Sequence, residues 1–355
     1  LFGTLKHLKF YSPWATAEDT FLLDYPPMQP GSSGLHSDGP EAKRTVEELF
    51  KYPRIEFIRT IKTDAMLAEH LLQELKRRRV DLKPCPDKDC NPRVALISEW
   101  DTLYGRSLPR TFAAVAMNNG SGKAGAALES EINKLRRDEW PGWITPHSYL
   151  AGLDGELPAK EEDQKKEGAQ SKVKAWYEGS SQDVEQNAGQ RPEGRGQLDY
   201  LLRLAAALKQ EEARSGEEFK AIGVLGSDVY DKLLILQALR QTFPRAIFFT
   251  TDLNARLAYP PQWQFTRNLI VASHFGLELQ PALQTPIPPF RDNYQTSLFY
   301  AALWALEHFS ARVDCPDCFQ LSVGKGKEPQ PAIFSGNVAP RLYEIGRHGA
   351  FDIST

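Results

Sequence analysis

Short apolar segments alternate with helical patterns along most of this sequence, and this alternation constrains the fold more than any other feature. Strands are predicted at 8–11, 54–61, 94–97, 144–150, 221–225, 246–250 and 268–273. Helices are predicted at 63–79, 198–213, 229–242 and 292–309, and a helical pattern also follows the strand at 94–97. A strand, a helix and a second strand in succession form a parallel unit. The sequence therefore predicts an α/β protein whose parallel sheets are flanked by helices.

Composition excludes several classes of protein. Hydrophobic residues make up 41% of the chain and charged residues 25%, which is typical of a globular protein. No apolar run approaches the roughly 20 residues that a membrane-spanning helix needs. The formal net charge is −3, so the chain has no overall positive field that would attract nucleic acid. We therefore expect no nucleic-acid partner.

Two segments differ from the rest of the chain in composition. Residues 25–44 are rich in Pro, Gly and Ser and predict a surface loop. Residues 155–197 are polar, charged and poor in large aliphatic side chains, and they predict a mobile insertion. The N-terminus has neither Met nor a signal-peptide pattern. We expect a fragment, or a mature domain cut from a longer precursor.

The four cysteines occur as two local pairs. Cys85 and Cys90 lie in PCPDKDC, and Cys315 and Cys318 lie in DCPDCF. Two local disulfides would suit an oxidising compartment, and free thiols are a second interpretation. A zinc site with four thiolates is the third, because the spacing of the second pair is that of a zinc knuckle. The sequence leaves these three alternatives open.

No catalytic or nucleotide-binding motif is complete. The segment NNGSGKAG resembles a phosphate-binding loop, but Met117 and Ala124 occupy positions that need Gly and Ser or Thr. The sequence has no GxGxxG, HExxH or GxSxG pattern, and its histidines are scattered. We therefore expect a binding protein rather than an enzyme, with no cofactor and no metal at its ligand site.

The segments that follow the predicted strands are the best places to look for a ligand site. In parallel α/β sheets, ligands bind outside the carboxyl ends of the strands. Here those segments are SPWAT at 12–16, SEWDTLYG at 98–105, GSD at 226–228 and TTDLN at 250–254.

The order of these segments resembles the type I periplasmic-binding-protein fold, above all the branched-chain amino-acid-binding proteins and the related receptor ligand-binding domains. Those proteins carry an SPxAT loop, then FRTxxSD before a helix, then a strand followed by DxxYG. This chain has SPWAT, FIRTIKTD at 57–64 and ALISEWDTLYG at 95–105 in that order. NYQTSLFYAALWALE at 293–307 is similar to a late helix of the family. The resemblance covers most of residues 8–310.

The resemblance implies two lobes of parallel sheet and helices that close on a ligand by hinge motion. Residues 1–91 would form the first part of lobe one, and 92–250 would form lobe two with the insertion. Residues 251–330 would return to lobe one, and the tail at 331–355 would cross back to lobe two. The family's first lobe begins well before the SPxAT loop, so lobe one is expected to be incomplete here.

The resemblance also implies a ligand site in the cleft between the lobes. Its residues would be Ser12, Trp14, Ala15, Thr16, Tyr104, Ser227, Asp228 and Asp252.

The expected roles in this site differ, and each has a structural alternative. In the family, the hydroxyl and amide groups of the loop that contains Ser12 and Thr16 hold a ligand carboxylate, although the same side chains also stabilise turns. Tyr104 would present its ring and hydroxyl to the ligand. Asp252 matches the acidic residue that holds an α-amino group, and its alternative is a helix cap or a salt bridge. Asp228 would contact the ligand or cap the next helix.

The function expected on these grounds is the non-catalytic binding of a small solute for uptake or sensing. The solute would be an amino acid or a related amide, and the location periplasmic or otherwise extracytoplasmic. The expected partner is an ABC-transporter permease or a membrane signalling protein, and a homodimer is a further expectation. The alternatives are an interaction module whose cleft binds nothing, and a cytoplasmic regulator.

Overall fold

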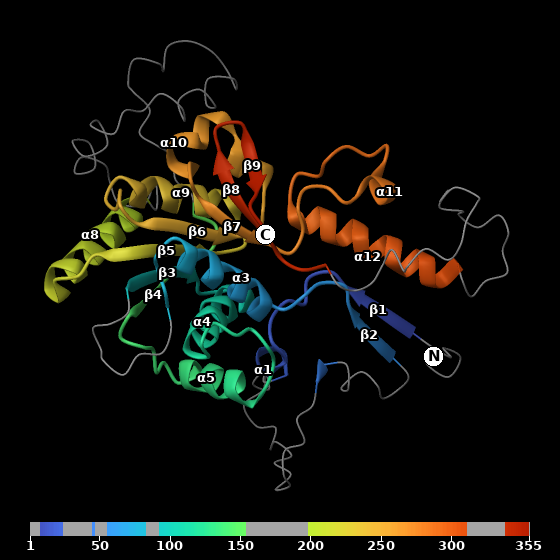
Figure 1. Cartoon of the computed structure of the whole chain (residues 1–355), viewed down its shortest axis with the longest axis horizontal. Coiled ribbons are helices and arrows are strands. Elements are labelled where there is room, and N and C mark those ends of the chain that lie inside the picture. The colour runs from blue at the N-terminus through green and yellow to red at the C-terminus, as the bar shows by residue number, and fades with distance from the viewer. Residues whose placement is uncertain are drawn as a thin grey trace, which may run out of the picture.

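The computed structural model describes residues 8–23, 45–46, 55–82, 92–153, 198–310 and 338–354. Its main feature is a seven-stranded sheet with the order β4-β3-β5-β6-β7-β8-β9 (Figure 1). The strands are β3 (Arg93–Glu99), β4 (Ile144–Tyr149), β5 (Phe219–Leu225), β6 (Ile247–Thr251), β7 (Ile270–Ser273), β8 (Arg341–Gly346) and β9 (Gly349–Asp352). Neighbours from β4 to β7 pair in parallel, whereas β8 pairs antiparallel with both β7 and β9. The predicted α/β class is confirmed.

Helices cover both faces of this sheet. They are α3 (Asp64–Arg77), α4 (Leu103–Met117) and α5 (Ala126–Arg136) on one face, and α8 (Leu198–Ser215) and α9 (Val229–Arg240) on the other. Along β3, Val94 and Leu96 pack into the core on the α3–α4–α5 face, whereas Ala95 and Ile97 pack into the core on the α8–α9 face. Successive side chains of a strand point to opposite faces, so a strand covered on both sides must be apolar throughout.

The core beneath β5 and β6 depends on one close approach. The rings of Phe112 and Phe249 stack with their centroids 5.2 Å apart. A Cβ atom at Gly223 on β5 would lie only 2.5 Å from the ring of Phe249. Glycine at this position therefore makes room for the aromatic pair between the sheet and α4.

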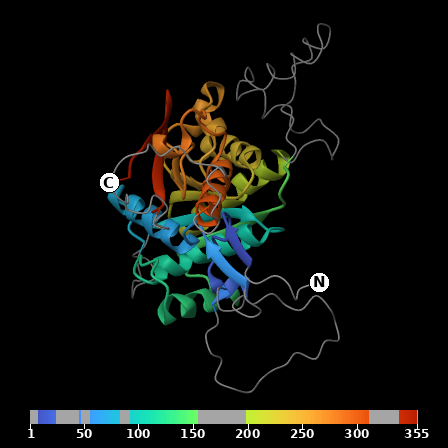
Figure 2. The same cartoon turned by 90° about the vertical axis from the view of Figure 1, so that its right-hand side faces the viewer.

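A second, smaller parallel sheet consists of β1 (Leu8–Ser12) and β2 (Ile55–Arg59). Helix α12 (Asn293–Ser310) packs on β1, with the rings of Tyr11 and Trp304 6.2 Å apart. These three elements lie together to one side of the large sheet (Figures 1 and 2). Shorter elements complete the described chain, namely α1 (Asp19–Leu22), η3 (Ala255–Ala258), η4 (Pro260–Gln262), α10 (Trp263–Thr266) and α11 (Pro281–Gln284).

The chain passes between the two sheets at residues that differ from the predicted lobe boundaries. We expected the first crossing near residue 91, but α3 already packs against α4 and β7, because its Leu67, Leu71 and Leu75 are buried in the core of the large sheet. We expected the return near residue 251, but β7 pairs with β6 in the large sheet. The crossings therefore lie between β2 and α3, and between β7 and α12. The strands β8 and β9 of the tail join the large sheet.

Several sequence-based predictions fall outside the described residues. They concern the loop at 25–44, the insertion at 155–197 and all four cysteines.

The aromatic pair on the α4 side of the sheet generates a stability prediction. Phe112 is 1% exposed, whereas Phe351 on the edge strand β9 is 54% exposed. Phe112→Ala should lower the free energy of unfolding by about 3–5 kcal/mol, since it removes a buried ring and leaves a cavity. Phe351→Ala, the matched control, should lower it by less than about 1 kcal/mol. Urea denaturation of both variants checks this, and equal losses would contradict the described core.

Candidate functional site

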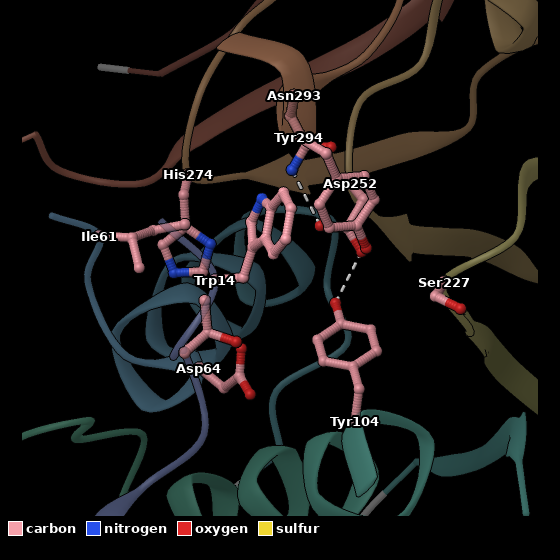
Figure 3. A pocket seen from close by; sticks show the side chains of 10 residues that line it. Trp14, Ile61, Asp64, Tyr104, Ser227, Asp252, His274, Asn293 and Tyr294 are labelled. Carbon is pink, nitrogen blue, oxygen red and sulfur yellow. Dashed lines mark hydrogen bonds between the residues drawn. The ribbon is translucent and has the colours of Figure 1, made fainter. Parts of the chain in front are cut away.

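A pocket of about 390 Å³ lies where the carboxyl ends of strands from both sheets come together (Figure 3). Its lining residues follow β1, β2, β5, β6 and β7 or begin α3, α4 and α12; they are Trp14, Thr16, Ile61, Asp64, Tyr104, Ser227, Asp252, His274, Asn293 and Tyr294. This is the edge at which parallel α/β sheets bind ligands. The pocket brings together five of the residues predicted from sequence, namely Trp14, Thr16, Tyr104, Ser227 and Asp252.

Asp252 is the most densely bonded side chain of the pocket. Its Oδ2 accepts hydrogen bonds from the Tyr104 hydroxyl at 2.7 Å and the Thr251 hydroxyl at 3.1 Å. Its Oδ1 accepts a hydrogen bond from the side-chain amide of Asn293 at 3.0 Å. The backbone of Asp252 has φ of 61°, in the left-handed region that aspartate tolerates better than most residues. This carboxylate therefore joins α4, β6 and α12.

Behind the pocket, Lys232 of α9 supplies a positive charge. Its Nζ lies 3.7 Å from Asp252 Oδ2 and donates a hydrogen bond to the Thr251 carbonyl at 2.7 Å. The Lys232 side chain is 1% exposed, and burial lowers its pKa, while the carboxylate of Asp252 opposes that shift. A buried ammonium group needs such a partner, because desolvation of an unpaired charge is very costly.

Asp64, at the first position of α3, has no comparable partners. Its carboxylate is fully buried, and neither oxygen makes a hydrogen bond of normal geometry with a described residue. Burial raises the pKa of Asp64 to about 8. The nearby Thr16 side chain lowers this pKa, whereas the negative charges of Asp252 and Glu18 raise it further.

His274 follows β7 and closes another side of the pocket. Its Nε2 lies 3.3 Å from the Thr63 carbonyl. Burial lowers the pKa of His274 to about 4, so the imidazole is neutral near pH 7. The ring therefore presents a neutral polar group.

The loop after β1 uses two of its amides internally, whereas its Ser12 and Thr16 carbonyls accept hydrogen bonds from the Thr60 and Asp64 amides. The Ala15 amide donates to the Ser12 hydroxyl at 3.2 Å, and the Thr16 amide donates to the Trp14 carbonyl at 2.9 Å. Trp14 and Thr16 line the pocket, whereas Ser12 and Ala15 are not among its lining residues.

The loop before α4 explains how Tyr104 reaches the pocket. Thr102 caps the helix by accepting a hydrogen bond from the Gly105 amide at 2.9 Å. A Cβ atom on Gly105 would lie 2.4 Å from the Glu99 carbonyl oxygen, so only glycine fits here. This tight start of α4 directs the Tyr104 ring toward Asp252 (Figure 3).

Ser227 and Asp228, in the GSD segment that follows β5, have different environments. Asp228 accepts hydrogen bonds from the Tyr230 and Asp231 amides and caps α9, which is the structural alternative predicted for it. Ser227 lines the pocket, but its hydroxyl donates to the buried carboxylate of Glu99 at 2.9 Å.

Sequence reasoning missed half of the lining residues, namely Ile61, Asp64, His274, Asn293 and Tyr294. Asp64 stands in the FIRTIKTD segment and Asn293 opens the NYQ segment, so both lie in motifs that carried the resemblance. His274 directly follows the strand at 268–273, and its position after a strand was the available signal.

No family model and no curated protein matches this chain. Comparison with solved structures finds an ABC transporter substrate-binding protein from Desulfitobacterium hafniense at 13% identity and a TM-score of 0.41, over 86% of this chain and 70% of that one. A branched chain amino acid ABC transporter from Thermus thermophilus with bound valine is similar at 13% identity and a TM-score of 0.41, over 84% of this chain and 66% of that one. A fatty acid ABC transporter substrate-binding protein from Thermomonospora curvata is similar at 9% identity and a TM-score of 0.43, over 84% of this chain and 64% of that one. These proteins are of the kind that the sequence motifs resemble, and the chain spans about two thirds of their length.

The described residues contain neither a candidate metal site nor a candidate membrane-spanning helix. No group of three or more His, Cys, Asp or Glu side chains among them is arranged to hold a metal ion. None of the helices in this part of the chain is long and apolar enough to cross a membrane.

The environment of Asp64 predicts how stability depends on pH. In the folded protein the pKa of Asp64 is about 8, raised from an ordinary value of 3.8. The folded state therefore keeps a proton that the unfolded state releases, and stability must fall as pH rises from about 4 to 8. Urea denaturation across this range should show that wild type loses more stability than Asp64→Asn.

The matched control for this measurement is Asp199→Asn, which changes an exposed carboxylate on α8. Its pH profile should run parallel to that of the wild type. Parallel profiles for wild type and Asp64→Asn would show that Asp64 is ionised throughout this pH range.

Proposed function

We propose that this chain binds a small solute, without catalysis, in the pocket between its two sheets. The observation that carries the proposal is the pocket itself, a cavity of about 390 Å³ at the carboxyl ends of strands from both sheets. Ligand pockets occupy about 300–1,000 Å³ and combine apolar walls with a few convergent polar groups. Here Ile61 and the rings of Trp14 and Tyr294 form an apolar part, and Asp64, Asn293 and His274 supply polar groups.

The bonding of the polar lining residues supports binding rather than hydrolysis. A serine nucleophile needs a base within hydrogen-bond reach, and that base is normally oriented by a third group. The Ser227 hydroxyl donates to Glu99, and His274 Nε2 lies beside the Thr63 carbonyl. The pocket's serine and histidine therefore have separate partners and do not form a catalytic pair.

The proposed solute is an amino acid or a related amide, and the proposed setting is extracytoplasmic. Both rest on the order of the SPWAT, FIRTIKTD and DTLYG segments, which resembles that of the solute-binding family. A transporter permease or a membrane signalling protein would receive the loaded form. Closure would occur at the crossings between β2 and α3 and between β7 and α12, where the chain passes from one sheet to the other.

Two tryptophans of nearly equal exposure give a matched test of this proposal. Trp14 is 55% exposed and lines the pocket, whereas Trp100 is 57% exposed and is not among the lining residues. A thermal-shift screen of amino acids, small amides and short organic acids should identify a stabilising solute. Trp14→Ala should weaken binding of that solute by about tenfold or more, because it removes a large contact surface. Trp100→Ala should leave the affinity unchanged.

The outcomes separate the proposal from its alternative. A solute present at about a hundred times its Kd adds roughly 2.7 kcal/mol of stability, which is a clear shift in Tm. A flat screen from a chain that melts cooperatively would favour an interaction module whose cleft binds nothing. Equal effects of the two tryptophan substitutions would place the solute outside this pocket.

A further inference from the structure

We propose that the chain has a second binding site, for the doubly charged oxyanion of a phosphate group, at the cluster formed by Arg240, Trp263 and Arg267. We call these three residues the arginine cluster. It lies at the amino ends of β6 and β7, whereas the pocket lies at the carboxyl ends of the same strands. The inference therefore goes beyond the proposed function and does not depend on it.

Arg240 carries a positive charge that has no counterion among the described residues. It is the last residue of α9 and is half-buried, and its Nε and Nη2 atoms make no hydrogen bond with any described residue. Its guanidinium carbon lies 4.5 Å from the centroid of the Phe248 ring, which covers one face of the group. A charge withdrawn from water normally has a charged partner and hydrogen bonds, because its desolvation is costly. Arg240 lacks such a partner.

The surroundings of Arg240 do not supply the missing negative charge. Burial and the positive charge of Arg267 lower the pKa of Arg240 to about 10, so its guanidinium group is still charged near pH 7. Glu218, which precedes β5, pairs with Lys220 and Arg245. The carbonyl groups at the end of α9 attract a cation, but neither Nε nor Nη2 of Arg240 bonds to them.

Arg267 connects Arg240 to Trp263. The Arg267 guanidinium carbon lies 5.8 Å from the centroid of the Trp263 ring, and its charge acts on Arg240. The indole Nε1 of Trp263 is buried and makes no hydrogen bond with a described residue. Helix α10, which begins with Trp263, packs on α9 and β8 (Figure 1). Buried N–H donors without partners thus accompany two positive charges at this edge of the sheet.

The turn between β8 and β9 adds positive charge at the same edge. The Asn268 amide donates a hydrogen bond to the Ile345 carbonyl at 2.8 Å. This pairing brings Arg347, an exposed residue of the turn, close in the backbone register to Arg267. An anion would therefore approach a locally positive region, although the formal net charge of the chain is −3.

The charge and the donors of the arginine cluster match phosphate better than a single carboxylate. A guanidinium group binds either anion through parallel N–H bonds. A carboxylate has one negative charge and two oxygens, whereas a phosphate monoester carries a charge of about −1.5 to −2 and three free oxygens. The two guanidinium groups and the indole N–H correspond to the larger charge and the larger number of oxygens.

Arg240→Met tests whether the guanidinium group waits for an anion. In a buffer without polyvalent anions, the Tm of this variant should equal or exceed that of the wild type, because it removes a desolvated charge and keeps an apolar side chain. Inorganic phosphate should raise the Tm of the wild type in a saturable manner and leave that of Arg240→Met unchanged. Equal responses to phosphate, or a clear loss of stability without it, would overturn the inference.

Arg267→Gln changes an exposed residue and tests the affinity directly. Titration calorimetry with methyl phosphate at constant ionic strength should show binding weakened by about tenfold or more, because a charge-assisted hydrogen bond is lost. Arg203→Gln is the matched control, since Arg203 is exposed on α8 and pairs with Asp199 at 3.0 Å, and it should bind like the wild type. Acetate should bind the wild type at least about tenfold more weakly than methyl phosphate. Equal affinities of the two anions, or of Arg267→Gln and Arg203→Gln, would contradict the assignment.

Trp14→Ala distinguishes the arginine cluster from the pocket. Trp14 lines the pocket, so its replacement should leave the affinity for methyl phosphate unchanged. Loss of methyl phosphate binding in Trp14→Ala, with normal binding in Arg267→Gln, would place the anion in the pocket and overturn the inference.

A phosphate group can belong to a soluble ester or to a lipid head group, and sedimentation with vesicles distinguishes the two sources. Phosphatidylcholine vesicles with and without phosphatidate are compared for the wild type and Arg267→Gln. Phosphatidate-dependent sedimentation of the wild type alone identifies a lipid head group, and binding of methyl phosphate without such sedimentation identifies a soluble ester. If the wild type binds neither, the inference is wrong, whereas the proposed binding of a solute in the pocket is unaffected.

Discussion

The buried contact between Lys232 and Asp252 is the interaction on which the pocket depends. Lys232 comes from α9, and Asp252 directly follows β6 in a left-handed backbone conformation, with its side chain directed toward α4 and α12. Tyr104 and Asn293 then bind the same carboxylate from those two helices. Because α12 also packs on β1, one carboxylate links the large sheet to the element that carries the small sheet. Removal of one member of a buried ion pair typically costs about 3–5 kcal/mol, because the remaining charge is left buried without a partner.

Much of the fold could be predicted because it follows from local patterns. The apolar run before SEWDTLYG marks a strand buried on both faces, and its alternate residues do pack into two separate cores. The leucines of α3 have helical spacing, but the pattern does not say which sheet they cover. That choice depends on contacts with α4 and β7, which are distant in sequence. For this reason the helix at 63–79 could be predicted from its own pattern, whereas its packing against the large sheet could not.

The site shows the same division between local and distant information. Parallel topology places the segments that follow strands at one edge, and the family resemblance singled out Trp14, Tyr104 and Asp252 within them; all three line the pocket. Their roles depend on hydrogen-bond partners that no local pattern encodes. Asp64 and Asp252 each follow a threonine, in IKTD and TTD, and look alike in the sequence. Only the folded arrangement distinguishes the aspartate that has three hydrogen bonds and a cation from the one that has none of normal geometry.

These two aspartates, which both line the pocket, differ in how their carboxyl groups are bonded. On the Asp252 side, the polar groups are paired with one another, because Tyr104, Thr251 and Asn293 donate to the carboxylate and Lys232 lies beside it. On the Asp64 side, burial and neighbouring carboxylates favour the protonated acid, and a cation reverses that preference. The free energy of unfolding is therefore linked to pH through Asp64, whereas the Asp252 network joins α4, β6 and α12.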